Sequence, residues 1–111
     1  MTRLLLLLLP LFCLVPPARA ADDAVHGFFD GDDLLRWCTM KDALCTGYVA
    51  GVSDELSRNG PSVCRPAHVT VAQLRDLVTL YLEQHPEERR LQASSLVVGA
   101  LRDAWACRGG R

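Results

Sequence analysis

Five cysteines, three histidines and several pairs of adjacent carboxylates are the side chains of this 111-residue sequence best suited to chemistry. Cysteines can form disulfides, bind a metal or act as nucleophiles. Four of them lie beyond the first twenty residues: Cys38, Cys45, Cys64 and Cys107. Their spacings lack the C-x2-C pairs of structural zinc sites, and exported thiols tend to oxidise. We therefore favour structural disulfides over a metal site or a redox site.

The histidines, serines and carboxylates form no recognisable catalytic constellation. The three histidines are far apart in the sequence: His26, His68 and His85. The serines lie in no nucleophile-elbow motif. The carboxylate pairs Asp54-Glu55 and Glu87-Glu88 are neighbours on predicted helices, where adjacent side chains point in different directions. We therefore predict no catalytic, cofactor-binding or metal site, and no enzymatic activity.

The first twenty residues have the features of a secretory signal peptide. A positive start precedes an apolar run of about 12 residues, then Pro16-Pro17 and the small-residue motif Ala18-Arg19-Ala20. We predict cleavage after Ala20 and export to the periplasm. The run is shorter than the roughly 20 residues that span a bilayer, which argues against a retained anchor. Bulky Phe12 before Cys13 argues against a lipoprotein.

The mature chain would keep 91 residues, enough for one small domain. It would lose Arg3 and Arg19 and keep ten basic against thirteen acidic residues, a net charge of −3. A mildly acidic surface argues against nucleic acid or an anionic membrane as the partner. We expect residues 21–27 to form a flexible leader, residues 28–107 the helical domain and residues 108–111 a tail.

Four helices are predicted, and no segment alternates with the period of a strand. The first is short and follows Asp30, which can cap its N-terminus. The second begins near Asp42 and carries an apolar stripe at helical spacing: Cys45, Tyr48, Val49, Val52 and Leu56. Gly47 and Gly51 lie four apart on another face and cost ~1 kcal/mol each in helix propensity. Close packing there, within the monomer or across a dimer, would offset that cost.

The third helix has the clearest start in the sequence. It follows the turn signal Asn59-Gly60-Pro61 and an extended stretch, and it begins at a capping box formed by Thr70 and Gln73. It ends near Gln84, because Pro86 disfavours helical geometry in the residue before it.

The fourth helix is placed from Pro86 to Cys107. Proline suits the first position of a helix, and Glu87 and Glu88 would lie in the first turn, where negative charge favours the helix dipole. The sequence contains no internal repeat. The predicted fold class is therefore all-α, a small four-helix domain.

Four cysteines allow three disulfide pairings, and the predicted helices favour one of them. Cys38 closes the first helix and Cys45 opens the second, so a short turn brings them together. Cys64 precedes the third helix and Cys107 ends the fourth, and antiparallel packing of those helices would place both at one end. We predict Cys38–Cys45 and Cys64–Cys107. From the entropy of loop closure, we expect Cys64–Cys107, which closes the longer loop, to stabilise the fold by ~4 kcal/mol and Cys38–Cys45 by ~2.5 kcal/mol.

Several short motifs follow one another along the mature chain. They are Phe29-x-Gly31-x-x-Leu34-Leu35-x-x-Cys38, Cys45-x-Gly47-Tyr48-Val49-x-Gly51-Val52-x-Asp54, Cys64-x-Pro66-x-x-Val69-Thr70-x-x-Gln73-Leu74, Tyr81-Leu82-x-x-His85-Pro86-Glu87, and Ala100-Leu101 with Cys107. In this order, behind a signal peptide, they resemble the Rap1a/Tai immunity protein family. The resemblance extends over nearly the whole mature chain.

The resemblance implies a small all-helical periplasmic protein, often a homodimer. Such a protein binds and occludes a peptidoglycan amidase effector of type VI secretion, which protects the cell from its own toxin. Because element ends are polar, we place partner contacts in residues 54–63 and 85–90: Asp54, Glu55, Arg58, His85, Glu87 and Glu88. Two alternatives are a small helical periplasmic chaperone or stress protein with no amidase partner, and a small hydrolase or redox enzyme.

Overall fold

The structure is a computed structural model that describes residues 27–59 and 62–108. It contains four α-helices: α1 Gly31–Thr39, α2 Ala43–Arg58, α3 Val71–Gln84 and α4 Ala93–Trp105, with a 3₁₀ turn η1 at Pro86–Glu88. Strand-like pairing in this part of the chain is limited to isolated bridges, and the all-α prediction is confirmed. The expected signal peptide, most of the leader and residues 109–111 of the tail lie outside the described residues.

The three predicted helix caps are present. The carboxylate of Asp30 accepts the N–H of Asp33 at 2.9 Å, and Asp33 accepts the N–H of Asp30 in return, so α1 has a capping box as well. Asp42 accepts the N–H of Leu44 at 2.8 Å at the start of α2. Thr70 and Gln73 form the predicted capping box of α3. These bonds satisfy amide groups that have no partner inside the helix.

The predicted start of the fourth helix at Pro86 is wrong. Pro86–Glu88 forms one 3₁₀ turn, and α4 begins at Ala93. The intervening backbone bonds instead to the start of α1: the amide groups of Gly31, Asp32 and Ala93 donate to the carbonyls of Leu91, Arg89 and Phe29 at 3.0, 3.1 and 2.9 Å. We call this pairing of residues 29–32 with residues 89–93 the clasp. Because the clasp uses these groups, they cannot form a helical ladder.

Gly31 makes the clasp possible. A Cβ atom at this position would lie 2.7 Å from the carbonyl oxygen of Arg89 and would also overlap the side chain of Leu96. Both contacts would be closer than van der Waals contact allows, so only glycine lets the two backbones approach this closely. The requirement explains a glycine at the buried start of a helix, where its low helix propensity is a cost.

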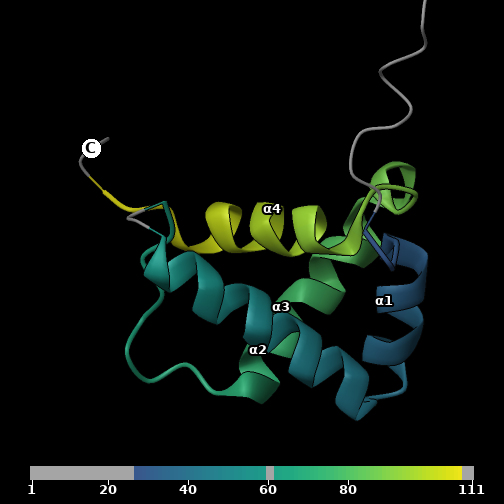
Figure 1. Cartoon of the computed structure of the whole chain (residues 1–111), viewed down its shortest axis with the longest axis horizontal. Coiled ribbons are helices and arrows are strands. Elements are labelled where there is room, and N and C mark those ends of the chain that lie inside the picture. The colour runs from purple at the N-terminus through teal and green to yellow at the C-terminus, as the bar shows by residue number, and fades with distance from the viewer. Residues whose placement is uncertain (1–26, 60–61, 109–111) are drawn as a thin grey trace, which may run out of the picture.

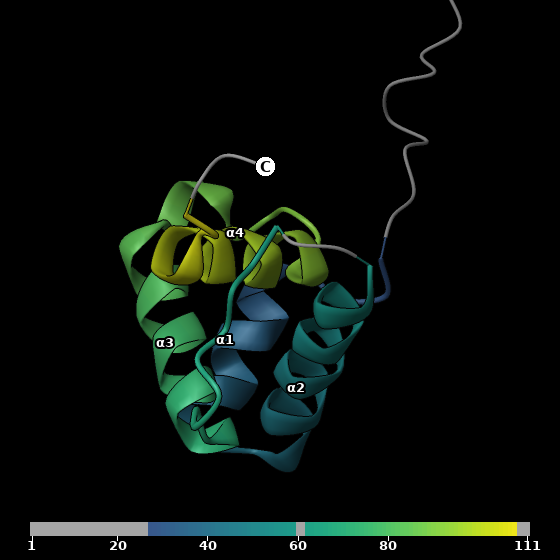
Figure 2. The same cartoon turned by 90° about the vertical axis from the view of Figure 1, so that its left-hand side faces the viewer.

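The core lies between α1, α2 and α3 and continues beneath α4, which crosses one end of these three helices (Figures 1 and 2). Each helix buries one face, and the buried apolar residues are Leu34, Cys38, Cys45, Val49, Leu74, Val78, Leu82, Ala93, Leu96, Val97, Ala100 and Leu101. Phe29 extends this packing at the surface, with its ring centroid 4.8 Å from that of Trp37 and 6.1 Å from that of Tyr48. The clasp and the core therefore fix α4 against α1, α2 and α3.

Both predicted disulfides are confirmed, Cys38–Cys45 and Cys64–Cys107. The reason given for the second pair differs from the structure, because α4 crosses α3 and does not pack antiparallel to it (Figure 2). Residues 62–70, which we call the strap, leave the end of α2 and pass the end of α4. There the N–H of Cys64 donates to the carbonyl of Trp105 at 2.7 Å. The pairing therefore follows from the path of the strap.

The two disulfides should differ in their response to a reductant. Cys38 and Cys45 are buried at 3% and 0% exposure, whereas Cys64 is exposed. A thiolate must reach a sulfur atom to open a disulfide, so a limited dose of dithiol should open Cys64–Cys107 first. Differential alkylation and mass spectrometry would measure the order. Opening of Cys38–Cys45 first would contradict this assignment of accessibility.

Candidate functional site

The second half of α2 carries three residues of the predicted contact set, Asp54, Glu55 and Arg58, and all three are exposed. Asp54 is also part of a structural contact. Arg65 of the strap donates from Nη1 to Ser53 Oγ at 2.7 Å and to Asp54 Oδ1 at 3.3 Å. Ser53 is buried, so Arg65 supplies a partner that a buried hydroxyl needs. This contact holds the strap against α2.

Glu55 and Arg58 pair locally on the helix surface. Arg58 Nη1 lies 3.2 Å from Glu55 Oε2, and Asn59 donates to the other carboxylate oxygen. Pairs three or four residues apart on an exposed helix contribute only about 0.2–0.5 kcal/mol. These side chains therefore remain available to a partner at low cost.

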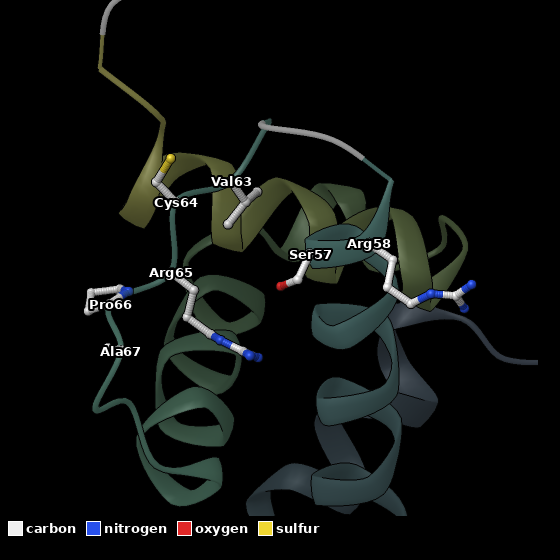
Figure 3. A pocket seen from close by; sticks show the side chains of 7 residues that line it. All are labelled: Ser57, Arg58, Val63, Cys64, Arg65, Pro66 and Ala67. Atoms are coloured by element: carbon white, nitrogen blue, oxygen red, sulfur yellow. The ribbon is translucent and has the colours of Figure 1, made fainter.

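A hollow of about 590 Å³ lies between the end of α2 and the strap (Figure 3). Arg65 points from the strap toward α2, and Ser57 points into the hollow, whereas Arg58 points away from it. The two arginines therefore do not converge on one point. Among the described residues that line the hollow, Ser57 carries a hydroxyl, and no histidine or carboxylate lies beside it in the lining.

The other half of the predicted set is organised around Tyr81. The ring of His85 stacks on that of Tyr81, with centroids 4.0 Å apart and an interplanar angle of 23°. His85 Nδ1 lies 2.7 Å from the carbonyl oxygen of Tyr81, and the Tyr81 hydroxyl donates to Glu88 Oε2 at 3.2 Å. Glu87 is exposed beside them. His85 and Glu88 are thus held in place by Tyr81. The first two residues were predicted as partner contacts, whereas Tyr81 was not.

Gly99 of α4 gives Tyr81 its position. A Cβ atom at Gly99 would lie 2.8 Å from the Tyr81 hydroxyl oxygen, so the absence of a side chain lets the ring lie against α4. The pKa of Tyr81 is raised above its ordinary value, mainly by burial. The nearby carboxylates of Glu88, Asp103 and Glu87 raise it further. Asp103 lies far from the other two in sequence, so only the tertiary fold reveals the acidic character of this corner.

The structure does not bring the two predicted contact regions together. Asp54, Glu55 and Arg58 lie on α2, and His85, Glu87 and Glu88 lie at the junction of α3 and η1. No hydrogen bond or salt bridge between described residues joins the two groups. They are therefore two separate surfaces, each of which can make its own contact with a partner.

A third exposed surface is the glycine face of α2. No atom outside the helix and the neighbouring residues lies within 4 Å of a Cβ built at Gly47 or at Gly51. Two explanations were expected for these glycines, packing inside the monomer and packing across a dimer. Within residues 27–59 and 62–108, nothing packs against them.

Within the described residues, no cluster of three or more His, Cys, Asp or Glu side chains is arranged to hold a metal ion. The four cysteines of this part are all in disulfides. No helix there combines the length and apolarity needed to cross a membrane.

A family model described as Rap1a immunity proteins matches residues 30–107. The chain belongs to this family. The matched segment of the Rap1a immunity protein begins at the Asp30 cap and ends at Cys107, so it includes α1 to α4 and the disulfides Cys38–Cys45 and Cys64–Cys107. Among curated proteins and among solved structures, no significant match is found.

Several motif residues of this Rap1a immunity protein have structural roles. Gly31 permits the clasp, Thr70 and Gln73 cap α3, and the four cysteines form the disulfides. His85 and Glu87 belong to the Tyr81 corner. Asp103, Glu88 and Arg65 complete the surfaces described above and lie outside the quoted motifs. Glu88 was predicted as a contact residue, whereas Asp103 and Arg65 became apparent only from their contacts in the fold.

Replacing Glu88 by Gln should lower the pKa of Tyr81 toward its ordinary value, because a negative charge beside the hydroxyl is removed. In the native chain the folded state holds this proton more tightly than the unfolded state. The resulting stabilisation is present below the unfolded pKa and is lost as pH rises through the folded pKa. Absorbance titration of phenolate in a Tyr48→Phe background, where Tyr81 is the remaining tyrosine, would measure the shift.

Glu55→Gln on α2 is the matched control and should leave the Tyr81 titration unchanged. If Tyr81 titrated identically with Glu88 present and in the Glu88→Gln variant, the carboxylate of Glu88 would not act on the Tyr81 hydroxyl.

Proposed function

We propose that the chain is a periplasmic immunity protein that neutralises a peptidoglycan amidase effector of type VI secretion and is not itself an enzyme. The observation that carries this proposal is the family match over residues 30–107. Two disulfides fit an oxidising compartment such as the periplasm. The predicted signal peptide, cleaved after Ala20, would deliver the chain there.

Neutralisation would work by occlusion, since the chain only has to cover the catalytic cleft of the effector. A rigid surface loses little conformational freedom on binding and therefore gains affinity. The clasp and both disulfides supply that rigidity. We propose that Asp54, Glu55 and Arg58 contact the effector from one side of the domain, and His85, Glu87 and Glu88 from the other.

We also propose that the glycine face of α2 packs against a second copy of the chain. Gly47 and Gly51 leave the helix backbone open to close approach, and Leu44 beside them is 55% exposed. Two exposed helical glycines cost about 1 kcal/mol each, and a backbone contact across a dimer would offset this. A dimer would present each effector-binding surface twice.

Amidases secreted by the type VI system of the same strain provide the test of neutralisation. One of them should lose its peptidoglycan hydrolysis when mixed with a stoichiometric amount of the mature chain, because a covered cleft cannot admit its substrate. Cells that receive this amidase in the periplasm should survive only when the chain is exported, so a variant that begins at Ala21 without the signal should not protect.

An unrelated muramidase is the control and should be unaffected. Charge reversal at Asp54 and Glu55, or at Glu87 and Glu88, would show which surface contributes, as a change in the inhibition constant. Full hydrolysis of peptidoglycan by every such amidase in the presence of excess chain would contradict the proposal. Protection of many unrelated proteins from aggregation at low pH would then favour the chaperone alternative.

The variants Gly47→Ala and Gly51→Ala test the dimer. Each should raise the free energy of unfolding of the monomer by up to ~1 kcal/mol, because alanine favours helix and meets no neighbour. Gly51→Leu should weaken self-association by holding the partner backbone away. Urea unfolding and sedimentation measure the two effects.

Gly99→Ala is the control, because its Cβ would meet the hydroxyl of Tyr81 and should bring no gain in stability. Sedimentation of the native chain as a monomer at high concentration would rule the dimer out.

A further inference from the structure

A groove of about 290 Å³ runs between α3 and α4 on the exposed side of Tyr81. Its floor is apolar: Leu77, Leu80 and Tyr81 come from α3, and Ala100 and Ala104 come from α4. Leu80 is 54% exposed, a large apolar surface to leave in water. The apolar residues on the α4 side are small, with Ala100 buried at 1% exposure and Ala104 exposed, so they leave room for a side chain from outside.

The rim of the groove is acidic. Asp103 lines it directly, and Glu88 lies beside it, since Glu88 Oε2 accepts the hydrogen bond of the Tyr81 hydroxyl at 3.2 Å. In the described chain, the residues that line the groove include no lysine or arginine. Arg89 is committed elsewhere, since its Nε lies 3.2 Å from Asp32 and its Nη1 donates to the Leu82 carbonyl. Gln84 and His85 complete the lining, so among the described residues the carboxylates face no lysine or arginine across the groove.

We propose that this groove docks a segment of the effector in which an apolar side chain is followed by a basic one. The apolar side chain lies against Leu77 and Leu80, and the cation faces Asp103 and Glu88. This inference rests on the proposed function for the identity of the partner. Its chemistry follows from the groove, because an apolar floor selects a leucine-sized side chain and an uncompensated acidic rim selects a positive charge.

Short peptides can probe the groove without the effector. The chain is purified from the periplasm, labelled with ¹⁵N and titrated at low salt with N-acetyl-Leu-Arg-amide. Chemical shifts should change mainly in residues 77–85 and 99–104. The same peptide with citrulline in place of arginine keeps the shape and loses the charge, and it should bind about two- to fivefold more weakly, the effect of an exposed ion pair. N-acetyl-Ala-Arg-amide should also bind more weakly, because it fills less of the apolar floor.

Matched variants test the floor and the rim separately. Asp103→Asn should remove the preference for arginine over citrulline, and Leu80→Ser should weaken both peptides. Glu83→Gln on the same helix and Leu91→Ser, at a leucine that is 48% exposed, should change neither affinity. Leu80 is exposed, so its variant should keep the native circular dichroism spectrum. Equal binding of the arginine and citrulline peptides, shifts outside the groove, or no shifts at all would overturn the proposal.

The effector then separates this inference from the proposed function. Leu80→Ser and Asp103→Asn should each weaken inhibition of the neutralised amidase about fivefold or more, as residues central to an interface do. If both variants inhibit the amidase as well as the native chain does, the groove is not its docking site. The immunity function would then still stand. Selective peptide binding with no amidase neutralised would refute the immunity function and leave the groove as a site for basic segments.

Discussion

The clasp between residues 29–32 and residues 89–93 is the constraint on which the rest of the structure depends. Three backbone hydrogen bonds join the start of α1 to the segment before α4, and Gly31 allows the two backbones to meet. Because these groups are bonded there, the chain cannot continue as a helix after η1. It turns instead, and α4 crosses the ends of the other helices (Figure 1). The groove beside Tyr81 exists because of that crossing.

The disulfides complete what the clasp begins. Cys38–Cys45 holds the turn between α1 and α2, where Lys41 adopts a positive φ of 53°, a conformation that most residues avoid. Cys64–Cys107 fixes the strap to the end of α4, and Arg65 fixes the same strap to α2 through Ser53. A domain of this size buries a modest core, so covalent links contribute a large part of its stability.

Local signals predicted much of this fold. The caps at Asp30, Asp42 and Thr70 depend on residues three or fewer positions away, and the sequence shows them directly. The start of α4 was misplaced because Pro86 and two glutamates satisfy the local rules for a helix start, while the decisive hydrogen bonds come from residues near position 30. The cysteine pairing was predicted correctly although α3 and α4 are not antiparallel, since the strap brings Cys64 to the end of α4.

The candidate surfaces likewise combine residues that the sequence indicates with residues that only the fold reveals. His85 and Glu88 stand out in the sequence as polar residues beside a proline, whereas Tyr81 has the spacing of a core residue and Asp103 has no local signal. Only the crossing of α4 brings Asp103 and Glu88 to one tyrosine. No sequence pattern reports whether a glycine is covered, so the openness of Gly47 and Gly51 also became visible only in three dimensions.

The separation of the clasp from the exposed surfaces has a consequence for how such proteins diversify. The clasp acts through backbone hydrogen bonds and the core through buried side chains, whereas Asp103 on the groove rim and Asp54, Glu55 and Arg58 on α2 are exposed. Substitutions at exposed positions usually change stability by about 0.5 kcal/mol or less. A lineage can therefore exchange the charges on these surfaces repeatedly, following a changing partner protein, with little effect on the free energy of unfolding.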